Sequence, residues 1–117
     1  MASLRDAWKG LSRVAHRIAV LVSNDSERRA LESLIVSYGF LAHKFPSVDA
    51  AFASRLRFDL ILIDYALGHA ALIDLIARLD RGSGNHYVPV LVLIDSWQVT
   101  SAVPWINDGV DEFVFRP

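Results

Sequence analysis

Cysteine is absent from the 117-residue sequence, so disulfide bonds and thiolate metal sites are excluded. The absence also fits a reducing compartment. No apolar run approaches the roughly 20 residues that a membrane-spanning helix needs, and residues 1–6 lack the apolar core of a signal peptide. We therefore expect a cytoplasmic protein with no membrane contact by this segment.

Excess charge is missing as well. The sequence has 12 basic and 13 acidic side chains, which leaves a formal net charge of -1. Nucleic-acid-binding domains usually carry a basic patch, so no direct nucleic-acid partner is expected. Hydrophobic residues, in contrast, make up 53% of the chain, which argues against disorder and suits one domain with a substantial core.

Short apolar runs are the strongest structural signal in the sequence. Residues 59–65 place four consecutive branched aliphatic residues between two aspartates, which is typical of a strand buried on both faces of a parallel sheet. Four more strands are predicted at residues 18–22, 40–45, 88–94 and 112–115. Helical patterns separate the strands at about residues 26–38, 47–56, 70–80 and 96–106. This alternation predicts an α/β fold, a doubly wound sheet of five parallel strands joined by right-handed crossovers.

Two helical segments need comment. Pro104 is expected to break or kink the helix at residues 96–106. Residues 3–15 are predicted to form an amphipathic helix, weakened at Gly10. Its apolar positions recur at helical spacing: Leu4, Trp8, Leu11 and Ala15.

The chain divides into residues 1–16 and a larger domain, residues 17–117. No residues remain after the last strand for the fifth helix that such a sheet normally has, so one face would be left bare. We expect the N-terminal helix to cover that face, within its own chain or swapped into a neighbour as a homodimer. The alternative is a linker helix that projects away from the sheet.

Asp64 lies at the carboxyl end of the central strand, where ligands and chemistry collect in open α/β sheets. It is therefore a candidate functional residue. The competing interpretation is that Asp64 caps the strand or begins a turn, as aspartate often does.

Four stretches in the expected order resemble the receiver domains of response regulators. They are residues 17–29, 58–64, 88–93 and 109–117. The second stretch, for example, is similar to the family's Pro-Asp-Leu-Ile-Leu-Leu-Asp run. The resemblance covers about residues 17–117 and implies the flavodoxin-like receiver fold, with strand order 2-1-3-4-5. It also implies a signalling domain rather than an enzyme and, because the sequence stops at the family's Lys-Pro position, a fragment of a longer protein.

In the family, an aspartate at the position of Asp64 accepts a phosphoryl group from a histidine kinase, with Mg²⁺ held by acidic residues after the first strand. Here those acidic positions align with Ser23 and Asn24. A one-residue slip would give Asn24 and Asp25, so at most one carboxylate, that of Asp25, joins Asp64 as a metal ligand. Because Mg²⁺ prefers carboxylate charge, we expect no cofactor or weak Mg²⁺ binding.

The residues that would assist phosphoryl transfer are also replaced. The family's Ser or Thr aligns with Ile94, which cannot hydrogen-bond a phosphoryl oxygen. The next position, usually small, is Asp95, and the family's Lys aligns with Arg116, whose planar fork is a different cation. We expect Asp25, Asp64, Asp95 and Arg116 to cluster at one end of the sheet, with an Asp95–Arg116 ion pair closing the phosphate pocket.

These substitutions favour a degenerate receiver-like domain of a phosphorelay that acts by protein–protein contact. The alternative is a genuine phosphoacceptor that uses Asp64. A second alternative is a nucleotide- or flavin-binding flavodoxin-like domain, although the only glycine-rich stretch, residues 82–84, follows a helix and not a strand.

The expected partners are proteins: a histidine kinase, an output domain or another receiver. In the family, the helix before the last strand and that strand form the signalling surface. The candidate interface residues are therefore Trp97, Trp105 and Phe113, although Trp105 could equally be packed. His69 lies near Asp64 in sequence and is interpreted as a solvated loop histidine.

Overall fold

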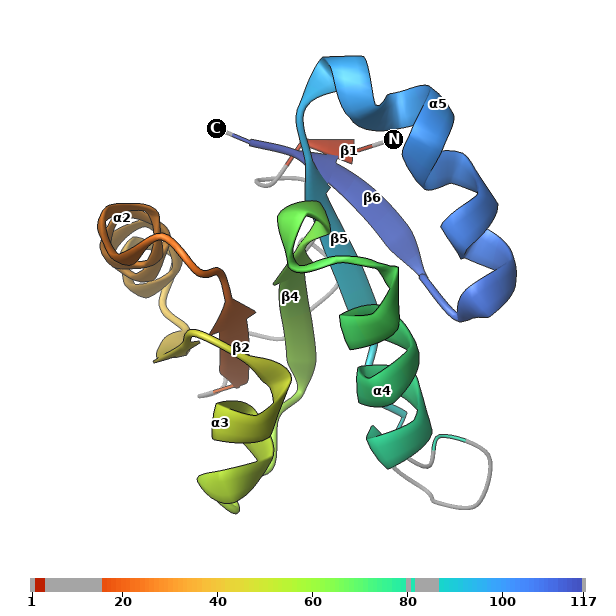
Figure 1. Cartoon of the computed structure of the whole chain (residues 1–117). Helices are drawn as coiled ribbons and strands as arrows, with labels where there is room; N and C mark the ends of the chain where they lie inside the picture. Colours follow the sequence, from red (N-terminus) through yellow and green to blue (C-terminus); the bar gives the residue numbers. More distant parts are fainter. Residues whose placement is uncertain (1, 4–15, 80, 82–86, 117) are drawn as a thin grey trace.

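A computed structural model describes residues 2–3, 16–79, 81 and 87–116 of the chain. These residues form one parallel sheet covered by helices (Figure 1). The strands are β1 (Ala2–Ser3), β2 (Arg17–Leu21), β3 (Leu41–Phe45), β4 (Leu60–Asp64), β5 (Val90–Ile94) and β6 (Glu112–Phe115). Their spatial order is β1-β6-β5-β4-β2-β3. Strands β2 to β6 thus take the predicted order 2-1-3-4-5, and the predicted fold class is confirmed.

The sheet has one strand more than the sequence predicted. β1 pairs in parallel with β6, with Ala2 opposite Val114 and Ser3 opposite Phe115. The predicted N-terminal helix is therefore wrong at residue 3, and its remainder, residues 4–15, lies outside the described residues. The physical reason for the extra strand is that an uncovered edge of β6 would present unpaired backbone N–H and C=O groups, which a neighbouring strand satisfies.

The described helices are short and mostly begin at polar caps. They are α2 (Asp25–Ser37), α3 (Val48–Ala53), α4 (His69–Leu79) and α5 (Val99–Ala102), with 3-10 helices η1 (Tyr65–Leu67), η2 (Ser96–Gln98) and η3 (Val103–Asp108). Asn24 caps α2 and Ser47 caps α3. The predicted break at Pro104 is confirmed, because α5 gives way to η3 at Val103. No helix among these described residues is long and apolar enough to cross a membrane.

Helices cover both faces of the sheet (Figure 1). α3, α4 and the α5–η3 segment pack on one face, over alternate strand residues that include Ala19, Leu21 and Ile63. α2 packs on the other face, where Ile18, Val20 and Leu62 are buried. β4 and β5 are buried along their whole length, and β2 at all but its first residue, which explains the continuous apolar runs of these three strands.

A polar network ties α4 to the amino ends of β5 and β6. The guanidinium of Arg81 donates to Tyr87 Oη at 2.7 Å, to Asp111 Oδ2 at 2.7 Å and to the carbonyl of Gly109 at 2.5 Å. Tyr87 Oη donates to Asp111 Oδ1 at 2.5 Å, and the Val90 N–H donates to Asp111 Oδ2 at 2.7 Å. Gly109 has a φ of 106°, and a Cβ there would lie 2.7 Å from the Arg81 guanidinium, so this approach requires glycine.

Because of this network, the folded protein should lose stability at alkaline pH. The hydrogen bond to Asp111, together with burial and the Asp111 charge, raises the pKa of Tyr87 above its ordinary value. A group with a raised folded-state pKa stabilises the fold fully below its unfolded-state pKa, and this contribution is lost as pH rises through the folded-state value. We expect the free energy of unfolding in urea to fall above about pH 10, and Tyr87→Phe to reduce that fall. The control variant Tyr38→Phe should show the same fall as the unmodified protein. A full fall in Tyr87→Phe as well would contradict the expectation.

Candidate functional site

Asp64 is the last residue of β4, and its side chain is enclosed: the residue is 4% exposed. Its Oδ1 accepts a hydrogen bond of 3.0 Å from the Ala66 N–H and so caps η1. Both interpretations of Asp64 therefore apply to the same residue, since it is a helix cap and also a buried carboxylate at the carboxyl end of the central strand. A buried carboxylate needs a second polar partner to offset its desolvation.

Arg116 supplies that partner. It follows β6, and its backbone N–H donates to the Ile94 carbonyl at 3.1 Å, which sets its side chain beside β4 and β5. Arg116 Nη2 lies 2.5 Å from Asp64 Oδ1. Burial alone would lower the pKa of Arg116, but the hydrogen bonds to Asp64 and Glu27 outweigh burial and raise it. The guanidinium is therefore a permanent cation held directly against the carboxylate.

Glu27 is the second carboxylate at this cation. Arg116 Nε donates to Glu27 Oε2 at 2.9 Å, and Nη2 donates to Oε1 at 3.3 Å. This two-point contact is the geometry in which arginine binds carboxylates most strongly. Sequence reasoning used Glu27 only as an acidic residue in the first turn of α2. The signal that could have found it is its place three residues after the Asn24 cap, which directs a side chain back toward the strand end.

Asp95 lies at the edge of this cluster. Its Oδ2 is 3.9 Å from Arg116 Nη1, so Asp64 and Glu27 are the closer partners of the guanidinium. The predicted Asp95–Arg116 ion pair is thus present, but it is longer than the contacts of Arg116 with Asp64 and Glu27. The reason is local: Asp95 precedes η2, and its N–H donates to Gln98 Oε1 at 2.7 Å, which holds this residue in a helix cap.

Asp25, which was expected to be a metal ligand beside Asp64, forms ion pairs along α2 instead. Its two carboxylate oxygens pair with Arg28 at 3.1 Å and Arg29 at 2.9 Å along α2. Asn24 Oδ1 accepts from the Glu27 N–H at 2.9 Å, and the carbonyl of Ser23 accepts from Arg28 Nη1 at 2.8 Å. The structure thus brings Asp64, Asp95 and Arg116 together, with Glu27 in the place proposed for Asp25.

The side chains present do not fit a magnesium site. Glu27 and Asp64 share one cation, Arg116, whose guanidinium stands between them. Within the described part of the chain, no group of three histidine, aspartate or glutamate side chains is arranged to hold a metal ion. Mg²⁺ would have to displace the guanidinium and recruit neutral ligands from Ser23 and Asn24.

The position equivalent to the family's Ser or Thr is also closed. Ile94 ends β5 and is fully buried, so it presents only aliphatic surface to its surroundings. Neither a hydroxyl nor an unpaired ammonium therefore faces Asp64 from β5 or β6, and the cation that does is already bound to two carboxylates.

Two of the three candidate interface residues are buried in this chain. Trp105 is 8% exposed and Phe113 is 2% exposed, because both pack into the core beneath the α5–η3 segment. The Trp105 ring stacks on Tyr65 at a centroid distance of 4.5 Å. Trp97, in η2, is 78% exposed and remains a candidate contact residue.

His69 is exposed, as predicted for a solvated histidine, but it does not lie in a loop. It is the first residue of α4, and its Nε2 lies 2.8 Å from Asp108 Oδ2. Its ring is 5.5 Å from that of Trp105. His69 thus ties the start of α4 to η3.

Among solved structures, this architecture matches receiver domains. A response-regulator receiver protein from Burkholderia phymatum superposes with a TM-score of 0.71 at 20% identity, covering 87% of this chain and 83% of that one. The receiver domain of a sensor histidine kinase from Pseudomonas aeruginosa, with magnesium coordinated in its active-site cleft, gives 0.71 at 18% identity, with 89% and 87% covered. NtrX from Brucella abortus, in complex with ATP, gives 0.75 at 21% identity; 89% of this chain is covered, but only 23% of NtrX.

The chain therefore has the receiver fold of response regulators. No protein-family model and no curated protein sequence matches it.

Proposed function

We propose that this chain is a degenerate receiver-like signalling domain, not an enzyme, which acts by protein–protein contact without a phosphorylation cycle. The observation that carries the proposal is the Arg116 guanidinium, held 2.5 Å from Asp64 and bound at two points to Glu27. The Arg116 guanidinium neutralises the charge of Asp64 and occupies the space beside this carboxylate that a metal ion and a phosphoryl group would need.

The charge balance of the site supports the proposal. Three carboxylates, those of Glu27, Asp64 and Asp95, surround one guanidinium. A phosphoryl group would add further negative charge at a site with no unpaired cation, and repulsion between like charges disfavours it. Phosphoryl transfer depends almost entirely on positioning and charge neutralisation, and both are lacking here.

An exposed apolar surface supports contact with a protein partner. Trp97, Val103 and Ile106 are 78%, 41% and 53% exposed on the segment between β5 and β6. Aromatic residues at such positions are common anchors of protein interfaces. The partner class that fits the proposal is a histidine kinase, an output domain or another receiver.

A phosphotransfer assay tests the proposal. With a small acyl phosphate donor and Mg²⁺, we expect no added phosphoryl group in the intact mass of the protein. A repaired variant, with Ser23→Asp, Asn24→Asp, Ile94→Thr and Arg116→Lys, should gain one phosphoryl group that Asp64→Asn removes, because it regains metal ligands, a hydroxyl and a compact ammonium. Stoichiometric phosphorylation of the unmodified protein on Asp64 would instead establish the phosphoacceptor function.

Magnesium binding should be weak or absent in the unmodified protein. The carboxylates available to a metal are already paired with arginine, and Mg²⁺ loses its water reluctantly. Titration monitored by tryptophan fluorescence or amide chemical shifts should show no saturable change below about 1 mM Mg²⁺. Sub-millimolar affinity that disappears in Asp64→Asn would contradict this expectation.

A further inference from the structure

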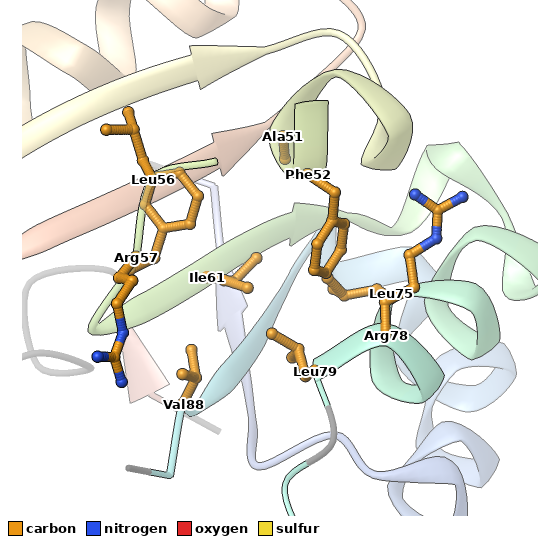
Figure 2. Close-up of a pocket in the computed structure, with 10 residues that line it drawn as sticks. Ala51, Phe52, Leu56, Arg57, Ile61, Leu75, Arg78, Leu79 and Val88 are labelled. Carbon is orange, nitrogen blue, oxygen red and sulfur yellow. The ribbon is translucent and has the colours of Figure 1, made fainter. Parts of the chain in front are cut away.

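A pocket lies at the opposite end of the sheet from Asp64, between α3 and α4 (Figure 2). Its volume is about 190 Å³. The floor is apolar and buried, formed by Ile61 of β4 and Leu75 of α4. Further walls come from the rings of Phe52 and Phe58, and from Leu56, Leu79 and Val88. A concave apolar site with a few polar groups at its rim is the usual form of a small-ligand pocket.

The pocket arises because α3 is short. α3 ends at Ala53, and the chain turns away at Arg55, whose φ of 57° is the left-handed conformation of a helix end. α4 continues to Leu79, so the apolar side chains of its last turns face a space that α3 does not reach.

Two arginines stand at the rim, on opposite sides of Ile61 in Figure 2: Arg57 and Arg78. The charge of Arg78 is balanced by two ion pairs, with Asp49 at 2.5 Å and with Asp74 at 3.0 Å. Its guanidinium also lies 5.3 Å from the centre of the Phe52 ring. Arg57 is exposed, and no acidic side chain in the described part of the chain pairs with it. At the rim of this apolar pocket, Arg57 is therefore the arginine whose charge is not paired with an acidic side chain of the described residues.

We propose that this pocket binds a small aromatic carboxylate, one ring bearing one carboxylate, with the ring on the apolar floor and the carboxylate at Arg57. The volume of the pocket suits a ligand with a single ring. An apolar cavity of about 150 Å³ accommodates benzene, and 190 Å³ leaves little room beyond one substituted ring. The aromatic walls favour offset or edge-on packing of a ring. The free guanidinium selects an anion over a cation of the same shape.

Amide and methyl chemical shifts, measured while benzoate is titrated into the full chain, test the proposal. We expect saturable shifts at Ala51, Leu75, Leu79 and Val88, with a Kd on the order of 1 mM for so small a ligand. Benzylamine, of the same shape and opposite charge, and acetate, which lacks the ring, should each bind at least several-fold more weakly than benzoate at these residues.

Two exposed arginines of the same connection give a matched pair of variants. Arg57→Gln should weaken benzoate binding about two- to fivefold, the worth of one solvent-exposed ion pair. Arg55→Gln removes the same charge two residues away, outside the pocket lining, and should leave the affinity unchanged. The proposal is overturned if benzoate causes no saturable shift, if benzylamine binds as tightly, or if the two variants affect binding equally.

Discussion

Replacing Arg116 by methionine should destabilise the protein by about 2–3 kcal/mol, because it leaves two carboxylates without their cation. Asp64 is 4% exposed and cannot exchange its lost partner for bulk water without opening the end of the sheet. The Arg116 side chain is 21% exposed, so the loss should be smaller than that for a fully buried pair. Urea unfolding at neutral pH measures the change.

Two further variants separate charge from packing. Arg29→Met removes a guanidinium from Asp25, but the Arg29 side chain is 71% exposed, so it should cost less than about 0.5 kcal/mol. Adding Asp64→Asn to Arg116→Met should recover about 1 kcal/mol, because the amide removes the unpaired charge and its oxygen still caps η1. A loss in Arg116→Met no larger than in Arg29→Met would show that this guanidinium does not hold the site together.

Deleting residues 1–15 should lower the melting temperature by on the order of 20 °C or more. The deletion should destabilise the protein because it would uncover apolar side chains on the face of the sheet on which α2 packs. Leu91 and Leu93 of β5 and Val114 of β6 are 3%, 0% and 0% exposed on this face, although the main contacts of α2 are with β2 and β3. Uncovering three such side chains costs about 1.5–3 kcal/mol each.

The topology says which segment should cover them. The chain passes from β1 to β2 in the same direction across the sheet as from β2 to β3, the connection that holds α2. Right-handed crossovers place both connections on the same face. We therefore expect residues 4–15 to cover β5 and β6, either in their own chain or in a neighbour.

Substitutions within the N-terminal segment sharpen the deletion experiment. Changing Leu4, Trp8 and Leu11 together to serine should reproduce most of the loss, because the sequence predicts that these residues form an apolar stripe. Changing the charged residues Arg5, Lys9 and Arg13 to serine should not. A melting temperature and oligomeric state that survive the deletion unchanged would mean that the segment does not cover the sheet.

Much of the candidate site was visible in the sequence. Asp64 and Ile94 could be placed at strand ends because each closes a continuous apolar run, and parallel strands bring their carboxyl ends to one edge. Arg116 could be placed beside them for the same reason. The contribution of Glu27 could not be predicted, because Glu27 and Arg116 are 89 residues apart and the choice between Glu27 and Asp25 depends on which side of the first turn of α2 lies toward Arg116.

The burial of Trp105 shows the same limit. The sequence predicted one helix over residues 96–106, but α5 changes to a 3-10 helix at Val103, and the change in period turns Trp105 inward onto Tyr65. Trp97 remains outside in η2, so one tryptophan packs into the core and the other is available to a partner.

The sequence by itself determined the order of strands and helices and their parallel arrangement, because apolar periodicity, turn residues and right-handed crossovers act between neighbours along the chain. Only the tertiary structure decided which carboxylates bind Arg116, that β1 pairs with β6, and that a pocket opens beneath α3. These features depend on distances of a few ångströms between side chains from separate elements, and such distances are set by how the elements pack and not by the local pattern of residues.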